Sequence, residues 1–122
     1  MPAIKGLEFG SGFGIAEMLG SEANDSYYYD GDQIKTRTNH NGGILGGITD
    51  GMPIIYKVAI KPPASITKVQ QTINIEDKTA AELSVEGRHD PIIVPRAIPV
   101  LEAVTAIAIL DLLLDSKFYK YD

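Results

Sequence analysis

The chain contains no cysteine and only two histidines among its 122 residues. The absence of cysteine excludes a disulfide scaffold, a thiolate metal site and a catalytic thiol. Two histidines alone do not provide the three or four ligands that a protein zinc site usually needs, so we expect no bound metal. The lack of cysteine agrees with a cytoplasmic location, which we predict.

A long uninterrupted apolar run is also missing. Nowhere do about 18 apolar residues follow one another, as a membrane-spanning helix needs. The first residues, 1–6, have no basic stretch ahead of an apolar one, which a secretory signal would show. We therefore expect a soluble protein without a targeting segment and without a membrane partner.

Positive charge is in deficit over the whole chain. Lys and Arg number 11 against 16 Asp and Glu, and the net charge of −5 argues against non-specific binding to nucleic acid. Residues 31–70 are the exception, with five basic residues against two acidic ones. This basic middle third is open to two interpretations, as a solvated face or as a region that meets an anion.

The apolar content suits one core, and we predict a single domain over residues 1–122. Hydrophobic residues make up 44% of the sequence. The pattern of apolar residues, turns and prolines predicts an α+β fold of antiparallel hairpins packed on helices. The predicted strands are 3–9, a hairpin of 43–48 with 52–61 about the turn Thr49–Gly51, and a hairpin of 72–76 with 82–86; the predicted helices are 11–19, ended by Gly20, and 100–114, after Pro95 and Pro99.

Two segments show no regular pattern, and one helix shows an unusual one. Residues 21–41 predict a long loop, and residues 115–122 predict a frayed tail. The helix at 100–114 is apolar nearly all round, which predicts that it is buried against another chain or against a missing part of the same protein; we expect a second chain to supply some of the cover. The side chains expected to be covered are Val104, Ile107 and Leu110.

Three short motifs contain the candidate chemistry. Asn39–Gly47 includes four glycines, which allow backbone N–H groups to approach a flat ring or a phosphate. Lys61–Ser65 ends a strand with a cation, two prolines and a hydroxyl, an arrangement that can hold a phosphate. Gly87–Pro91 places an arginine, a histidine and an aspartate at a strand-to-helix junction. Each motif also has a purely structural interpretation, as a glycine bend, a surface turn and a salt bridge.

Together and in this order, the three motifs resemble the C-terminal part of chorismate synthase, over about residues 2–114. The resemblance implies that Arg88 lies against the flavin and the substrate phosphate, and that Asp90 lies near flavin N5 and helps to move the proton. These two are the implied catalytic residues, and Arg37 is a second candidate for the substrate. The implied FMN-binding residues are Ala3, Gly46, Lys61, Ala64, Ser65 and Arg88.

The sequence departs from that family at two points. Pro63 stands where the family usually has threonine, which removes a hydroxyl and an N–H from the phosphate-binding turn. The family's two general-acid histidines belong to N-terminal motifs that this sequence does not contain. Neither His40 nor His89 is therefore expected to take their role.

The resemblance implies the activity of that family. Chorismate synthase eliminates phosphate from 5-enolpyruvylshikimate 3-phosphate to give chorismate, with reduced FMN, in the shikimate pathway of aromatic amino acid biosynthesis. Its fold is a layered β-α-β sandwich assembled as a tetramer. We expect this chain to supply about half of that fold, to form a homo-oligomer, to require a missing N-terminal portion, and to be inactive by itself.

Two other classes of function stay open. A non-catalytic flavin- or phosphate-binding module would bind the ligand without turnover. A structural subdomain would associate with itself through the apolar helix and bind no ligand. All three interpretations depend on the same motifs, and ligand binding, turnover and self-association distinguish them.

Overall fold

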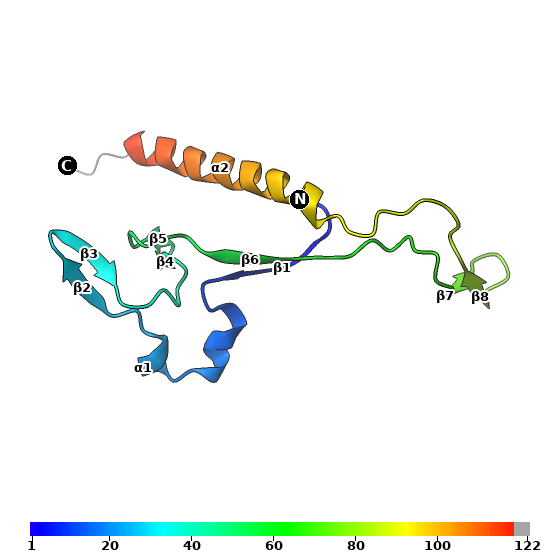
Figure 1. The fold of residues 1–122 in the computed structure, drawn as a ribbon, viewed down its shortest axis with the longest axis horizontal. Coiled ribbons are helices and arrows are strands. Elements are labelled where there is room, and N and C mark those ends of the chain that lie inside the picture. Colours follow the sequence, from blue (N-terminus) through cyan, green and yellow to red (C-terminus); the bar gives the residue numbers. More distant parts are fainter. Residues whose placement is uncertain (119–122) are drawn as a thin grey trace. The chain divides into compact units, whose positions relative to one another are not determined.

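The computed structural model describes residues 1–118, which divide into two compact units. One unit runs from Ile4 to Ile60, and the other consists of Met1–Ala3 and the chain from Lys61 onward. Antiparallel strand pairs and helices make up both units, so the predicted α+β class is confirmed (Figure 1). The single domain over residues 1–122 and the layered sandwich stay predictions.

The first unit is built on a pair of antiparallel strands, β1 (Ile4–Phe9) and β6 (Tyr56–Ile60). Phe9 lies opposite Tyr56, and their ring centroids are 5.8 Å apart. Exposure alternates along β6, with Tyr56, Val58 and Ile60 half-buried and the two residues between them exposed. The predicted strands and the predicted alternation are therefore confirmed.

The predicted hairpin about Thr49–Gly51 is wrong. A shorter hairpin forms upstream, between β4 (Ile44–Leu45) and β5 (Ile48–Thr49), while β6 pairs with β1. Gly46 and Gly47 form its turn with φ of 60° and 81°, the left-handed pair that a two-residue hairpin turn favours. The Gly-Gly pair therefore makes the turn that we assigned to Asp50-Gly51.

The predicted loop at 21–41 contains regular structure. Strands β2 (Tyr27–Asp30) and β3 (Gln33–Thr36) form a hairpin inside it. Tyrosine and threonine favour strands, but a two-stranded ribbon exposed on both sides needs no apolar alternation. The absence of a period, which we interpreted as a loop, is what such a ribbon produces.

The first helical segment also differs from the prediction. A 3-10 helix, η1 (Gly12–Glu17), follows Ser11, and a separate one-turn helix, α1 (Gly20–Ala23), begins where we expected Gly20 to end the first. The backbone N–H of Leu19 donates a 2.9 Å hydrogen bond to the Glu22 carboxylate, which caps α1. Gly20 is thus the start of a helix.

In the second unit, β7 (Gln70–Asn74) and β8 (Thr79–Leu83) form an antiparallel hairpin. The predicted hairpin at 72–76 and 82–86 is therefore confirmed in kind, but its strands lie two to three residues earlier in the sequence. As a result, Val85 lies outside the strand.

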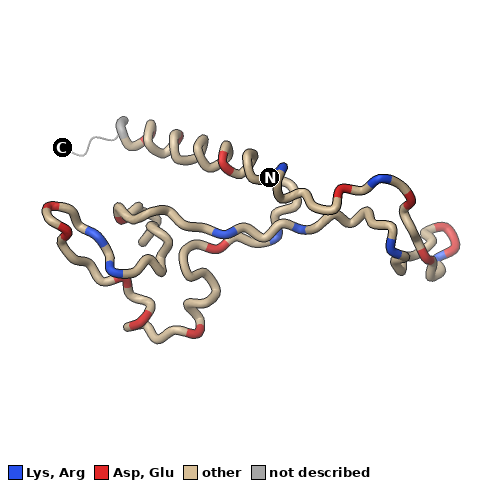
Figure 2. The backbone as a smooth tube through the Cα atoms, viewed as in Figure 1, with Lys and Arg blue, Asp and Glu red and all other residues tan. Residues whose placement is uncertain are grey.

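Helix α2 (Val94–Phe118) is longer than predicted. It begins before Pro95, includes Pro99 in its interior, and continues through the first part of the predicted tail; residues 119–122 of that tail lie outside the described residues. Proline at position 99 lacks the N–H that would bond four residues back, but the helix continues through it. Charged positions are sparse along α2 (Figure 2).

The apolar side chains of α2 are exposed in the single chain. Val104, Ile107 and Leu110 are 49%, 67% and 57% exposed, so the chain itself does not supply their predicted cover. By length and composition alone, the helix over Val94–Ser116 could also cross a membrane, since its most apolar 18-residue window has a mean hydropathy of 2.2. The sequence has no uninterrupted apolar run of that length, because Glu102, Thr105 and Asp111 interrupt it, but these residues do not lower the mean hydropathy below that of a spanning helix.

Candidate functional site

Two of the three motifs meet in the second unit. Residues from the segment 62–67, between β6 and β7, and from the segment 87–91, between β8 and α2, line one open cavity of about 420 Å³; Ala64, Ser65 and Arg88 are not among the lining residues. That volume lies within the usual range for ligand pockets. The β7–β8 hairpin separates the two segments in sequence and turns the chain back, so the fold brings the phosphate-binding turn beside the Arg-His-Asp segment.

His89 joins the two segments by hydrogen bonds. Its Nδ1 lies 2.7 Å from Ser65 Oγ, and its Nε2 lies 2.8 Å from the carbonyl oxygen of Val85. The imidazole is half-buried, while Ser65 is exposed. A histidine to which we assigned no role therefore fixes the position of a predicted phosphate-binding hydroxyl.

Asp90 lines the cavity, and its carboxylate is held by Arg96 in the first turns of α2. The two guanidinium nitrogens of Arg96 lie 2.7 and 3.2 Å from the two carboxylate oxygens. The salt bridge that we considered between Arg88 and Asp90 is thus made by Arg96 instead. We did not predict a role for Arg96. Its position beside Pro95, where a helix begins shortly after the Arg-His-Asp segment, could have indicated one.

The remaining predicted residues of this unit lie around the cavity rather than in it. Arg88 is exposed and is not among the cavity-lining residues. Lys61 is exposed, and its backbone N–H donates to the carbonyl oxygen of Ala3 at 2.8 Å, which brings these two predicted residues together. The carbonyl oxygen of Ala64 accepts a 3.3 Å hydrogen bond from Gln70.

The glycine-rich motif lies in the first unit and packs backbone against backbone. A Cβ on Gly10 would lie 2.0 Å from the carbonyl oxygen of His40, and a Cβ on Gly42 would lie 2.4 Å from the nitrogen of Gly10. Both residues also have positive φ, 55° and 66°. Only glycine fits at these two positions, so the close approach that the sequence predicted is made here to the chain itself.

Asp25 anchors the start of this motif. Its carboxylate accepts hydrogen bonds from the backbone N–H groups of His40 and Asn41, at 2.8 and 2.9 Å, and from the Thr38 hydroxyl at 2.7 Å. Partial burial acts to raise the pKa of Asp25, but the bonds from Asn41, His40 and Thr38 outweigh it and lower the pKa below its ordinary value. Sequence analysis placed Asp25 in a loop and gave it no role.

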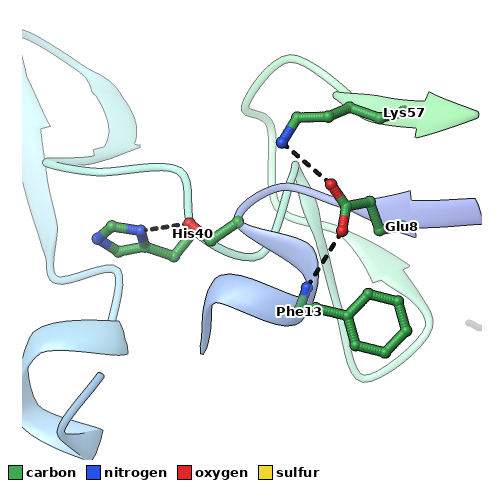
Figure 3. Close-up of polar contacts among 5 residues, drawn as sticks. Glu8, Phe13, His40 and Lys57 are labelled. Atoms are coloured by element: carbon green, nitrogen blue, oxygen red, sulfur yellow. Dashed lines mark hydrogen bonds and ion pairs between the residues drawn. The ribbon is translucent and has the colours of Figure 1, made fainter. Parts of the chain in front are cut away.

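Side-chain contacts near β1 hold the same motif from the other side (Figure 3). Ser11 Oγ lies 2.7 Å from His40 Nδ1, and the backbone N–H of Ser11 donates to the His40 carbonyl oxygen. Glu8 accepts bonds from Lys57 and from the backbone of Phe13, and these bonds lower its pKa. Ser11, His40 and Asp25 do not form a catalytic triad, because Asp25 bonds the His40 backbone and not its ring.

Two further predicted residues lie in the first unit. Gly46 is in the β4–β5 turn, with open space where a Cβ would point. Arg37 lies with its guanidinium 5.3 Å from the centroid of the Tyr28 ring, in a cation–π contact. Among the described residues, Asp50 Oδ2 is a buried acceptor without a hydrogen-bond partner.

The donor groups fit the cofactor that the motifs imply. A lysine, a serine hydroxyl and a cavity of suitable volume lie at the phosphate-binding turn, and an unobstructed glycine turn with a nearby buried acceptor lies at the glycine-rich motif. Pro63 lines the cavity and contributes apolar surface where the family usually has a hydroxyl. No cluster of metal ligands occurs within residues 1–118.

Comparison with known proteins gives one family. The family model described as chorismate synthase matches residues 1–114. The chain is 58% identical over 117 residues to the chorismate synthase of Methanococcus aeolicus and 52% identical over 117 residues to that of Methanocaldococcus jannaschii, with 95% of this chain and 31% of each relative covered. A crystal structure of chorismate synthase is 45% identical, with a TM-score of 0.48 over 50% of this chain and 18% of the other. The chain therefore spans about 31% of the length of these curated relatives.

Proposed function

Since the chain belongs to the chorismate synthase family, we propose that it forms part of an enzyme that converts 5-enolpyruvylshikimate 3-phosphate to chorismate and phosphate. The enzyme would be a lyase of the shikimate pathway, and reduced FMN would be its cofactor. When bound, the reduced flavin supplies electron density that eases the loss of phosphate. The protein has to bind an anionic substrate, orient it and move one proton.

The family resemblance assigns cofactor-binding residues to each of the two units. Lys61 and Ser65 would bind the flavin phosphate, as a cation and a hydroxyl, with the Ala64 backbone beside them. Gly46 would allow the flavin ring to approach the backbone, because no side chain occupies the space next to it. The resemblance adds Ala3 and Arg88 to this set.

Arg88 and Asp90 would act on the substrate. The exposed Arg88 guanidinium is free of the Asp90 carboxylate, which Arg96 holds instead. Arg88 would therefore be available to neutralise the departing phosphate, with Arg37 as a second candidate cation. Asp90 would accept the ring proton, and its two-point contact with Arg96 would fix its orientation.

The observation that supports this proposal most is the shared cavity. Residues of both segments line it together, and Ser65 is hydrogen-bonded to His89, one of the lining residues. A phosphate-binding hydroxyl is thus bonded to the cavity wall that contains a candidate proton acceptor, although 25 positions separate Ser65 from Asp90 in the sequence. A surface turn and a salt bridge of purely structural purpose would not need to meet.

Two substitutions test the proposal in the assembled enzyme that contains this chain. Arg88→Ala should weaken substrate or flavin binding, because it removes a cation that faces phosphate. Asp90→Asn keeps the shape and removes the proton acceptor, so it should lower kcat by about 10²–10⁴ with little change in KM. Steady-state kinetics under anaerobic conditions with reduced FMN, followed by chorismate absorbance, measures both.

Lys78→Ala is a matched control, because Lys78 is an exposed cation in the β7–β8 turn. It should leave both constants unchanged. Equal and small effects of the Arg88 and Asp90 substitutions would assign the pair to structure. FMN binding with normal affinity but no turnover by the assembled protein would favour the alternative of a non-catalytic module.

The same proposal covers the setting of the enzyme. We infer a cytoplasmic homo-oligomer, completed by an N-terminal portion with the family's histidines. The 122-residue chain by itself should show weak or no FMN binding and form no chorismate. Steady turnover by the pure chain would overturn the need for further segments.

A further inference from the structure

We propose that His89 is a positioning residue that sets the direction of the hydrogen bond donated by the Ser65 hydroxyl. Phosphate binding at Ser65 is thereby linked to proton uptake by His89. The proposal rests on the proposed function, because it takes the flavin phosphate as the ligand of Lys61 and Ser65. It assigns a role to a histidine that the proposed reaction does not use.

The two partners of the imidazole fix its tautomer. The carbonyl oxygen of Val85, 2.8 Å from Nε2, can only accept a hydrogen bond, so Nε2 has to hold a proton. In the neutral ring Nδ1 then has no proton. Ser65 Oγ, 2.7 Å from Nδ1, must therefore donate its own proton to the ring.

A serine hydroxyl has a single proton, so the ring and a phosphate compete for it. While His89 is neutral, that proton is directed to Nδ1, and only oxygen lone pairs of Ser65 face an approaching phosphate. When His89 takes up a proton, Nδ1–H donates to Ser65 Oγ instead. The hydroxyl proton is then released to bond a phosphate oxygen.

Phosphate binding and protonation of His89 therefore favour each other. By thermodynamic linkage, phosphate affinity has to fall as the pH rises through the titration of the ring. Histidine is the side chain that ordinarily changes charge between about pH 5 and 8, and the measurement therefore covers that range. A charge-assisted hydrogen bond of this kind is worth about tenfold in affinity.

The surrounding charges come from the segments next to the ring. Asp90 is the other ionisable residue among those that line the cavity, and Arg96 pairs with its carboxylate. The charged groups on and beside these segments are Lys61, Lys68, Glu86, Arg88, Asp90 and Arg96. The two imidazole nitrogens are hydrogen-bonded to Ser65 and Val85, not to these charged groups.

The test measures FMN affinity against pH in the assembled enzyme that contains this chain. Flavin fluorescence gives the dissociation constant of oxidised FMN between about pH 5.5 and 8.5. His89→Gln keeps a polar group at the position but cannot titrate. The ratio of wild-type to His89→Gln affinity should rise about tenfold from the high to the low end of this range, while ionisation of the ligand's own phosphate cancels in the ratio.

Riboflavin, which lacks the phosphate, is the matched ligand, and its affinity ratio should be constant with pH. Ser65→Ala is the second variant, because it keeps His89 and removes the hydroxyl; it should lose the same pH dependence. A constant FMN ratio for His89→Gln, or a full pH dependence in Ser65→Ala, would overturn the proposal and leave the proposed function intact. Failure of the wild-type enzyme to bind FMN at any pH would overturn the proposed function, and the linkage with it.

Discussion

Asp25 shows, at the scale of single residues, how one carboxylate can order a segment that has no regular structure. Its two oxygens accept three hydrogen bonds from residues 38–41, two of them from backbone N–H groups. Hydrogen bonds to a charged acceptor are among the stronger ones in proteins. The start of the glycine-rich motif therefore depends on the charge of a residue 13 to 16 positions earlier.

Asp25→Asn should loosen this segment. The amide would place a donor against backbone donors, and local stability should fall by about 1–3 kcal/mol. Because the pKa of Asp25 is lowered in the folded chain, its contribution is present above the ordinary pKa of aspartate and is lost as the pH falls through the folded value. The protection factors of the His40 and Asn41 amides, which are corrected for the intrinsic pH dependence of exchange, should therefore fall on acidification in the wild type and vary less with pH in Asp25→Asn.

The control for this prediction is Asp32→Asn, which neutralises an exposed acid in the β2–β3 turn. It should leave exchange at His40 and Asn41 unchanged. The same slow exchange in Asp25→Asn as in the wild type would show that the carboxylate does not order the motif.

At the scale of elements, the sequence predicted strands better than it predicted their partners. The alternation in β6 identified its half-buried face, but alternation does not say which strand lies alongside, and β1 is more than 45 residues away. The β7–β8 hairpin is local and was found. The β2–β3 hairpin was missed because an exposed ribbon shows no apolar period.

In the candidate site, too, the sequence predicted the residues but not their contacts. The motifs that line the cavity were named from residue types alone. The contacts of Ser65 with His89 and of Asp90 with Arg96 were not, because a spacing of 24 residues has no fixed geometry and two arginines stand within reach of one aspartate. Sequence indicates which groups can do chemistry, and the fold decides which of them touch.

Helix α2 contains a proline in its interior, where proline is normally unfavourable, and this can be tested. Pro99→Ala would restore a backbone N–H that can bond the carbonyl oxygen of Pro95, and the helix should gain about 1–3 kcal/mol. Pro95→Ala is the matched control: its N–H lies in the first turn, where it has no helical partner, so the change should be small. Circular dichroism during thermal unfolding measures both, and equal effects would show that Pro99 is not a local defect.

At the scale of the whole molecule, the dominant feature is the apolar surface of α2. Large aliphatic side chains along it are exposed, up to 69% at Leu112. A patch of this kind on a protein usually marks a contact surface. A second copy of the chain is the cover that we predict, as part of the proposed homo-oligomer.

Ile107→Glu should weaken that association. Burial of one such side chain is worth about 1.5–3 kcal/mol, so the dissociation constant should rise at least tenfold. The control is Ile75→Glu, which alters an even more exposed isoleucine outside α2. Sedimentation velocity over a range of concentrations gives the constants; a wild-type chain that stays monomeric while α2 amides exchange rapidly, or one that associates only with lipid, would contradict the prediction.

The contact between Gly10 and Gly42 limits how this part of the chain can change during evolution. When two side chains are in contact, a larger residue on one side can be balanced by a smaller one on the other. Here the atoms in contact are backbone atoms, and neither position has a side chain to give up. Every one of the other amino acids brings a Cβ, so no paired substitution can restore the fit. Divergence at these positions requires the backbone path itself to shift, in two segments 32 residues apart, at the same time.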